Sequence, residues 1–346
     1  MTVNEDHFAL VIGVDDYPNY RSLNGAKRDA QDFRDWLIDR ETGGGLKDEH
    51  VWLVLSDDDP ARPIHKHIDD ALEKLLDAAA TDAARLYIYF SGHGLSRSKT
   101  ATDLCLAEWS RRRNGLALDS ADYLEMLSDS GRFPEIIMLL DCCRIRKVRR
   151  RALPPTIDPA RPGDNAPEVR TFVAYATEFL NLAHEVAVEA DELDPDTLPL
   201  VRGHFTQALI QGLRGAAAES TGGVKASRLK EHLEVRTPEI ALLSQHHQTP
   251  EVVNGLLSNP EPIFGSALPL DVRLTMSVEI NFQSADDRHF VLEDGNLDII
   301  KEGTAAGGPW SLDLPRGQYF VREENKSAGV HLRISGHEME TINVTV

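Results

Sequence analysis

Between residue 8 and about residue 215, short apolar runs alternate with segments in which apolar residues recur at helical spacing. Residues 8–14 predict a first buried strand, and the continuous apolar runs at 86–90 and 136–140 predict central strands that helices cover on both faces. Such strand-helix-strand alternation is typical of a mostly parallel sheet. The pattern therefore predicts the α/β class for this part of the chain.

The same periodicities predict the other elements around this sheet. We expect a helix that begins near Ala26 and ends at the glycines 43–45, strands at 51–55 and 171–176, a hairpin near 104–106 and 116–118, and helices around 65–79, 120–128 and 204–213.

From residue 272 onward the hydrophobic period changes to two. Val278, Ile280 and Phe282 alternate with polar residues, and turn-forming sequences such as Asp294-Gly295 end the later segments. This alternation predicts a small C-terminal all-β sandwich of about seven short strands.

The two patterns together predict two domains, a larger one at residues 1–265 and an accessory one at 270–346. Within the larger one, residues 144–151 are strongly basic, and the following stretch to residue 167 is rich in Pro, Gly and Asp. This composition predicts an exposed linker at about 144–168.

Composition and charge narrow the class of protein. No apolar run approaches the roughly 18 residues that cross a bilayer, and the first apolar stretch lacks the positive flank of a signal peptide. The three cysteines include an adjacent pair, Cys142 and Cys143, which disfavours a disulfide framework. A formal charge of −19 disfavours nucleic acid and favours a basic partner. We expect a cytoplasmic protein without a membrane or nucleic-acid partner.

Two reactive side chains follow the two best-defined strands. The strand at 86–90 leads into Ser91-Gly92-His93-Gly94, and the strand at 136–140 leads into Asp141-Cys142-Cys143. If these strands are neighbours in a parallel sheet, the imidazole and the thiol face one cleft at its carboxyl edge. A thiol becomes nucleophilic as thiolate, for which His93 is the candidate base. The alternative is structural, because free cysteines are often buried, and we assign Cys105 to that role.

The chain resembles the caspase and metacaspase family of cysteine peptidases (peptidase family C14), in its prokaryotic branch, from Phe8 to about Pro250. Four segments carry the resemblance: Val11-Ile-Gly-Val-Asp-Asp-Tyr17 continuing to Leu23-Asn-Gly25 and Asp29, Tyr89-Phe-Ser-Gly-His-Gly94, Leu140-Asp-Cys-Cys143, and Gly203-His-Phe-Thr-Gln-Ala-Leu209. The resemblance implies a caspase-like fold. It also implies that Cys143 rather than Cys142 is the nucleophile.

The resemblance further implies a mechanism. Cys143 attacks the scissile carbonyl, His93 manages the proton, and the backbone N–H groups of Gly94 and Cys143 form the oxyanion hole. The family does not require a carboxylate as a third catalytic residue, and no third residue can be named from the sequence.

Departures from the caspase pattern bear on specificity. Leu23 stands where caspases carry an aspartate-binding arginine, and Asp141 stands where they carry glutamine, which is the metacaspase arrangement. The carboxylates that match Asp29 and Asp141 hold a basic P1 side chain in metacaspases, since a guanidinium binds carboxylates through charge-assisted hydrogen bonds. We therefore expect cleavage after Arg, or Lys. The alternative for Asp29 is a solvated helix carboxylate.

The basic linker is a second functional lead. If the enzyme prefers Arg, then Arg149, Arg150 and Arg151 form a candidate processing site for self-cleavage or for an upstream activating protease. A merely solvated loop is nearly as good an explanation, and a nucleic-acid patch is disfavoured by the overall charge. We expect no cofactor and no metal site. Some metacaspases need calcium, but the acidic residues 57–59 do not match a calcium-loop spacing.

The sequence thus predicts an endopeptidase that acts on proteins with exposed Arg or Lys through a Cys-His dyad. A role in a bacterial stress or defence pathway rests on family analogy alone. The alternative function is a catalytically inactive caspase-like scaffold whose β-sandwich recruits partners.

Overall fold

The structure is a computed structural model that describes residues 4–79, 83–146, 151–158, 168–188, 200–218, 223–256, 263–264, 275–282, 287–294, 299–315, 317–324, 326, 329–334 and 340–344. The chain divides into two compact units. The first holds Met1–Glu219 and Gly223–Ser266, and the second holds Ser220–Gly222 and Ala267–Val346.

A six-stranded sheet forms the centre of the first unit. Its order is β15 (Glu251–Asn254), β11 (Arg170–Tyr175), β9 (Glu135–Asp141), β5 (Arg85–Ser91), β1 (His7–Gly13) and β2 (Val51–Leu55). All neighbours are parallel except β15, which is antiparallel to β11. The predicted mostly parallel sheet is confirmed.

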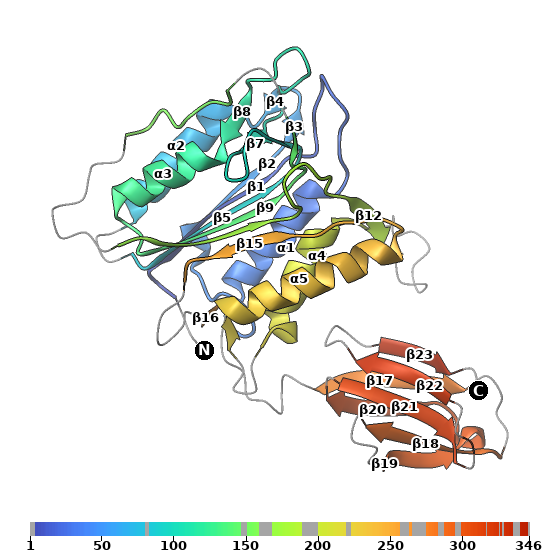
Figure 1. Cartoon of the computed structure of the whole chain (residues 1–346). Coiled ribbons are helices and arrows are strands. Elements are labelled where there is room, and N and C mark those ends of the chain that lie inside the picture. The colour runs from blue at the N-terminus through green and yellow to red at the C-terminus, as the bar shows by residue number, and fades with distance from the viewer. Residues whose placement is uncertain are drawn as a thin grey trace. The chain divides into compact units, whose positions relative to one another are not determined.

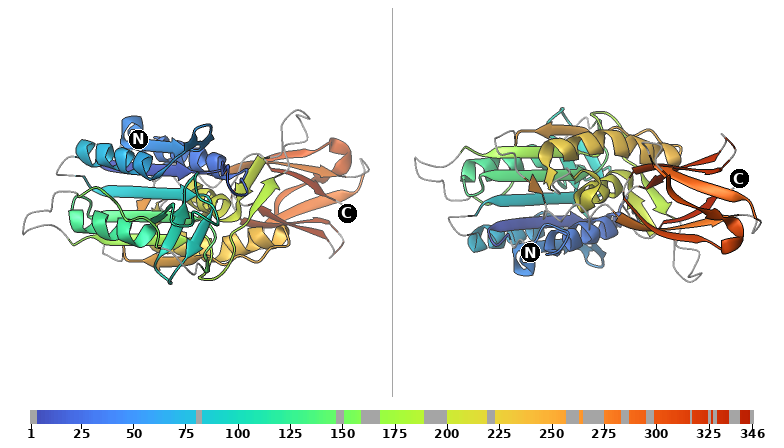
Figure 2. Two further views of the ribbon diagram at one scale, coloured as in Figure 1. Left: turned by 90° about the horizontal axis from the view of Figure 1, so that it is seen from above. Right: turned by 90° about the horizontal axis from the view of Figure 1, so that it is seen from below.

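Helices cover both faces of this sheet (Figures 1 and 2). The helices are α1 (Ala26–Ile38), α2 (His65–Ala78), α3 (Ser120–Ser130), α4 (His204–Gln211) and α5 (Ala226–Leu243). In β5, Leu86 and Ile88 pack against α2 and α3 in one apolar cluster, whereas Tyr87 and Tyr89 pack against α1, α4 and α5 in another. Successive strand residues point to opposite faces, so a strand covered on both sides is apolar throughout, as its sequence predicts.

The two strands that carry the reactive residues are adjacent. β5 and β9 pair in parallel from Arg85 opposite Glu135 to Ser91 opposite Asp141. Because parallel neighbours end at the same edge, the segments that follow Ser91 and Asp141 leave the sheet side by side.

A second sheet extends from these two segments. Its order is β10 (Ile145–Arg146), β6 (Gly94–Ser96), β7 (Thr102–Cys105) and β8 (Ala117–Asp119). β7 and β8 are antiparallel and form the predicted hairpin. β6 and β10 pair in parallel, so the chain after His93 and the chain after Cys143 stay together beyond the main sheet.

Shorter elements complete the first unit. They are the antiparallel pairs β3 (Asp57–Asp58) with β4 (Ala61–Arg62), β12 (Glu185–Val188) with β13 (Leu200–Gly203), and β14 (Val224–Lys225) with β16 (Ile263–Phe264), together with η1 (Asp48–His50) and η2 (Gly212–Ala216). The acidic residues at 57–59 thus lie in a hairpin.

The predicted exposed linker at about 144–168 is wrong for several of its residues. Arg144 is fully buried and Ile145 begins β10. Ala152 is also buried, and Leu153 exchanges backbone hydrogen bonds with β8 residues Ala117 and Asp119. Basic side chains are expected in solvent unless the fold supplies acceptors for them, and Arg144 has such acceptors. Residues 147–150 and 159–167 lie outside the described residues.

The second unit consists of two sheets. One has the order β20 (Trp310–Pro315), β17 (Thr275–Phe282), β23 (Glu340–Val344), and the other has the order β19 (Ile299–Thr304), β18 (His289–Asp294), β21 (Gly317–Glu323), β22 (Gly329–Ile334), with the short helix η3 (Ala305–Gly307). Val278 and Ile280 of β17 and Phe290 and Leu292 of β18 are buried in one apolar cluster. The predicted period of two is therefore confirmed in β17.

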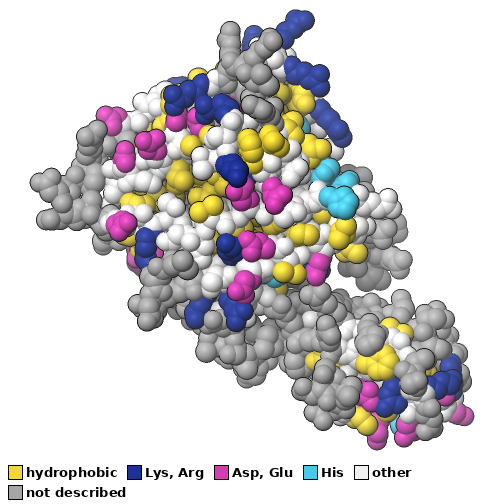
Figure 3. Space-filling view, viewed as in Figure 1, with side chains coloured by type: hydrophobic (Ala, Val, Ile, Leu, Met, Phe, Trp, Pro, Cys, Tyr) yellow, Lys and Arg dark blue, Asp and Glu magenta, His cyan; other side chains and the backbone are white. Residues whose placement is uncertain are grey.

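Among the described residues, no helix is both long enough and apolar enough to cross a membrane. On the face of the first unit that Figure 3 shows, acidic and basic side chains are scattered among hydrophobic ones.

Candidate active site

A cavity of about 420 Å³ opens at the carboxyl ends of β5 and β9. Its lining includes all the residues that the sequence predicts for catalysis and for the S1 pocket: Asp29, His93, Gly94, Asp141 and Cys143. The α1 helix contributes the first of these, and the loops after β5 and β9 contribute the reactive pair.

His93 is held through both its backbone and its ring. Its backbone N–H donates to the hydroxyl of Tyr17 (2.9 Å), which donates to the carbonyl of Cys105 (3.1 Å). Its ring Nε2 lies 2.7 Å from the carbonyl oxygen of Arg21. Because a carbonyl only accepts, Nε2 carries the proton and Nδ1 is left as the basic atom. The Arg21 carbonyl thus orients the imidazole, a role that could not be assigned from the sequence.

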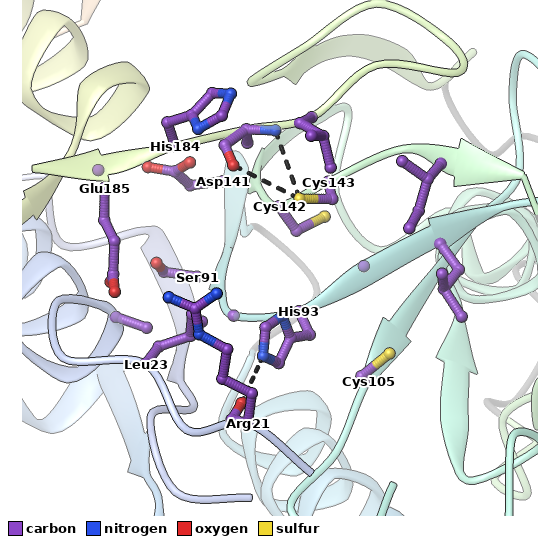
Figure 4. A pocket seen from close by; sticks show the side chains of 18 of the residues that line it. Arg21, Leu23, Ser91, His93, Cys105, Asp141, Cys142, Cys143, His184 and Glu185 are labelled. Carbon is purple, nitrogen blue, oxygen red and sulfur yellow. Dashed lines mark hydrogen bonds between the residues drawn. The ribbon is translucent and has the colours of Figure 1, made fainter. Parts of the chain in front are cut away.

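Cys143 is the second residue after the end of β9 and faces the same cavity (Figure 4). Its Sγ lies 3.4 Å from the backbone nitrogen and 3.5 Å from the carbonyl oxygen of Ala183. In this state the hydrogen bonds of the thiol therefore go to the Ala183 backbone, while that of the His93 ring goes to Arg21.

Burial sets the charge state of the reactive pair. It raises the pKa of the Cys143 thiol above its ordinary value, an effect that the N–H of Ala183 opposes. It also lowers the pKa of His93. Both shifts favour the neutral forms, a thiol and an imidazole, at pH 7.

The other two cysteines are enclosed. Cys105 and Cys142 are 0% and 2% exposed, and burial raises the pKa of Cys142 well above its ordinary value. A Cβ added to Gly94 would lie 2.5 Å from the Cys142 Sγ, so this thiol packs directly against the β6 backbone. Of the adjacent pair, Cys143 is the more exposed, which favours it as the nucleophile.

Asp29 and Asp141 meet at one end of the cavity. They are 1% and 6% exposed. Asp29 Oδ2 accepts the N–H of Gly203 (2.9 Å), and Asp141 Oδ2 accepts the N–H (3.1 Å) and the hydroxyl (2.6 Å) of Thr206. A Cβ at residue 203 would collide with the Asp141 carboxylate, so glycine is required there. Asp29 is therefore not a solvated helix carboxylate, and that alternative is wrong.

These two carboxyl groups lack sufficient compensating charge. Burial, with the nearby charge of Asp141, raises the pKa of Asp29 well above its ordinary value, although Arg202 acts in the opposite direction. Burial also raises the pKa of Asp141 to about 6. A cation bound between them would reverse both shifts and would bind more tightly for that reason.

Glu185 is a third carboxylate of this end that the sequence does not identify. Its side chain accepts the N–H groups of Asn24 (3.3 Å) and Gly25 (3.0 Å), and burial raises its pKa. Figure 4 shows Glu185 and Arg21 reaching toward the same end of the cavity. The surrounding residues of Glu185 have no distinctive pattern, because its place depends on the pairing of β12 with β13.

Arg144 anchors the segment that carries Cys143. Its guanidinium donates to the carbonyl of Thr177 (3.2 Å), to the Glu251 carboxylate (2.5 Å) and to the carbonyl of Lys99. Its backbone exchanges two hydrogen bonds of 3.0 Å with residues 180 and 181. The residue after Cys143 thus ties β9 to the loop that contacts the thiol.

Of the candidate processing residues, Arg149 and Arg150 lie outside the described residues. Arg151 is exposed and forms an ion pair of 2.5 Å with Asp122 on α3. Within the described parts of the chain, no three His, Cys, Asp or Glu side chains are arranged to hold a metal ion.

Comparison with known proteins gives the following findings. Residues 6–259 match the profile of the peptidase C14 family, described as the caspase domain. A probable protease of a Desulfuromonadales bacterium is 30% identical over 223 residues, which are 60% of this chain and 26% of that protein. The chain thus spans about a quarter of the length of this relative. The crystal structure of caspase-1 from Spodoptera frugiperda has a TM-score of 0.45 at 14% identity, over 74% of this chain and 88% of that chain.

The raised pKa of Cys143 predicts how its alkylation depends on pH. Labelling by iodoacetamide should be slow at pH 7 and should accelerate as the pH rises beyond the ordinary thiol pKa of about 8.5. Mass spectrometry of the labelled chain measures the rate, and Cys143→Ala serves as the control because Cys105 and Cys142 are buried. A rate already at its plateau at pH 6 would show instead a preformed thiolate–imidazolium pair.

The contacts of Arg144 predict a stability cost. Arg144→Met leaves the carbonyls of Thr177 and Lys99 without this donor and should lower the free energy of unfolding by about 3 kcal/mol. Urea titration followed by tryptophan fluorescence measures the loss. The exposed Arg112→Ala variant should stay within about 0.5 kcal/mol of the unmodified protein. Equal effects of the two substitutions would contradict the anchoring role.

Proposed function

The chain belongs to the caspase-domain family of peptidases, and from this premise we propose that it is a cysteine endopeptidase that cleaves proteins after Arg or Lys. The observation that carries the proposal is the single cavity in which His93 and Cys143 lie next to the buried carboxylates of Asp29 and Asp141. In this cavity His93 and Cys143 supply the chemistry, and the acidic end beside them supplies the specificity for the P1 residue.

The proposed reaction is acyl transfer to the thiol. The Cys143 Sγ attacks the scissile carbonyl carbon while His93 takes the thiol proton, and the imidazolium then gives that proton to the leaving amine. Water hydrolyses the resulting thioester and restores both groups. Gly94 and Cys143, which both line the cavity, supply the backbone N–H groups of the oxyanion hole.

Charge favours a basic P1 residue. A guanidinium between Asp29 and Asp141 would compensate two buried carboxylates at once, and Glu185 adds a third. The competing possibility is that Arg21, which also lines the cavity, receives an acidic P1 residue. The three carboxylates outnumber this single exposed arginine, so Arg or Lys is the better fit.

The described residues bear on processing at Arg151, one of the three candidate arginines. Proteases bind several extended residues on both sides of the bond they cut. Cleavage directly after Arg151 requires Ala152 and Leu153 to leave their places against β8, where Ala152 is buried and Leu153 is hydrogen-bonded. Self-cleavage after Arg151, or cleavage there by an upstream protease, would therefore need this segment to detach first, whereas Arg149 and Arg150 lie outside the described residues.

The alternative function is an inactive caspase-like scaffold. It is supported by the contact between the Cys143 thiol and the Ala183 backbone, which occupies the nucleophile in this state. Under the main proposal the same contact belongs to a latent form of the enzyme. That the enzyme acts on cytoplasmic proteins in a bacterial stress or defence pathway is proposed by family analogy alone.

Cleavage of fluorogenic peptides with Arg, Lys or Asp at P1 tests the proposal, with and without calcium. We expect cleavage after Arg and Lys, none after Asp, and none by Cys143→Ala. Preference for Asp at P1 would indicate that Arg21, and not the carboxylates, binds the P1 side chain. Absence of cleavage of every peptide would favour the scaffold.

Substitution of an S1 carboxylate by the amide of the same size tests whether its charge contributes to P1 recognition. Asp141→Asn keeps an oxygen for Thr206 but removes the charge, and should lower kcat/KM for the Arg peptide about 30-fold or more. The matched control is Asp48→Asn, which removes a carboxylate exposed at 69%. For the unmodified enzyme, KM should rise as the pH falls through about 6, because the Asp141 carboxyl then becomes protonated. A KM that is constant from pH 8 to pH 5 would exclude this group from S1.

Mass spectrometry of the active enzyme tests linker processing. We expect cleavage after Arg149 or Arg150, and loss of that cleavage together with reduced turnover when residues 149–151 are changed to Gln. An intact linker in fully active enzyme, with turnover unchanged by this substitution, would refute processing.

A further inference from the structure

The cavity has two chemically different ends, and the function proposed above uses only one of them. The carboxylates of Asp141 and Glu185 lie at the acidic end. Figure 4 shows them on one side of the pair formed by Cys143 and His93, with Cys105 on the other side. Apolar side chains line this opposite side, whereas carboxylates line the acidic end.

The opposite side of the cavity includes two short strands that follow His93 and Cys143 in the chain. β6 begins at Gly94, directly after His93, and β10 begins at Ile145, one residue beyond Arg144. The strands pair in parallel with Leu95 opposite Ile145, and both side chains line the cavity. The backbone pairing fixes these two apolar side chains next to the reactive pair.

Two aromatic side chains continue the same wall. The Tyr20 ring packs edge-on against Trp109, with centroids 4.8 Å apart, and against His93, with centroids 5.1 Å apart. Tyr20 and Trp109 also line the cavity. We call the wall formed by Tyr20, Leu95, Trp109 and Ile145 the apolar end.

The apolar end is open to a ligand. Tyr20 is 37% exposed and Ile145 is 38% exposed, although both are large and apolar. Exposed apolar side chains that line a cavity bind apolar groups, because the contact removes their surface from water. A small or charged ligand group would leave the apolar surface of these side chains in contact with water.

The mechanism determines which substrate residue meets this wall. This step rests on the proposed function. If the P1 side chain enters the acidic end, the scissile carbonyl lies at Cys143 and the leaving amine must reach His93 for its proton. Tyr20 contacts the His93 ring itself, so the chain that follows the scissile bond passes the apolar end.

We infer that Tyr20, Leu95 and Ile145 select a large apolar residue, such as Leu, Phe or Met, immediately after the scissile bond. The enzyme therefore recognises a basic–apolar pair of residues and not a basic residue alone.

Internally quenched peptides that share Arg at P1 and differ only at P1′ test this inference. The P1′ residue is Gly, Ser, Leu, Phe or Asp, and kcat/KM is measured for each. We expect Leu and Phe to be preferred over Gly by roughly tenfold, a typical range for filling an apolar pocket. In Ile145→Ser and Leu95→Ser the Leu-to-Gly ratio should fall toward one, while the Arg-to-Lys ratio at P1 stays constant. The control is Leu243→Ser, which removes a side chain exposed at 81% on α5, outside the cavity lining, and should leave every ratio unchanged.

Equal cleavage of the five peptides, or a preference for Asp or Gly at P1′, overturns the inference and leaves the proposed function standing. A Leu-to-Gly ratio that Ile145→Ser and Leu95→Ser do not change places the selection elsewhere and also overturns it. Cleavage that survives Cys143→Ala refutes the proposed function instead.

Binding supplies a second measurement that does not depend on turnover. Fluorescence anisotropy of the same peptides with the full-length Cys143→Ala chain should show roughly tenfold tighter binding for Leu than for Gly at P1′. Equal affinities would refute the apolar end as a binding surface, whatever the catalytic state of the unmodified chain.

Discussion

The parallel register of β5 and β9 is the constraint on which the site depends. Ser91 lies opposite Asp141 at the last paired position, so the two chains leave the sheet together and place His93 and Cys143 in one cavity. The pairing of β6 with β10 prolongs this contact. A shift of one residue would turn every side chain of a strand to the other face and would separate the apolar clusters from their helices. The core and the site therefore depend on the same register.

The acidic end shows a different constraint, the cost of burying charge. Asp29 and Asp141 are enclosed by α1, α4 and the backbone of Gly203, and the folded chain leaves them short of compensating charge. Such an arrangement lowers stability. The same uncompensated charge strengthens binding of a cationic ligand, because the ligand's charge removes the free-energy penalty of the buried carboxylates.

Much of the fold follows from sequence because its strands have a simple pattern. Residues 86–90 and 136–140 are apolar throughout, which is the property of strands buried on both faces, and the reactive residues directly follow them. Glu185 and Arg144 differ in this respect. The position of Glu185 depends on the pairing of β12 with β13, and Arg144 is buried because Glu251 and two carbonyls lie around it. Interactions between residues distant in sequence leave no local pattern. The basic residues around Arg144 therefore predict a solvent-exposed side chain, whereas the structure buries it.

The loop from Thr177 to Glu185 joins contacts that belong to separate tasks. Arg144 holds its start, Ala183 contacts the thiol, and Glu185 lies at the acidic end. Ala183 and Glu185 are two residues apart in the chain, so a backbone movement that carried Glu185 toward a bound cation would also move Ala183 and its contacts with the thiol. In a chain that moved in this way, cation binding and exposure of the thiol would be linked, and each would change the other by the same free energy. Such a chain would keep its thiol covered until a suitable side chain arrives.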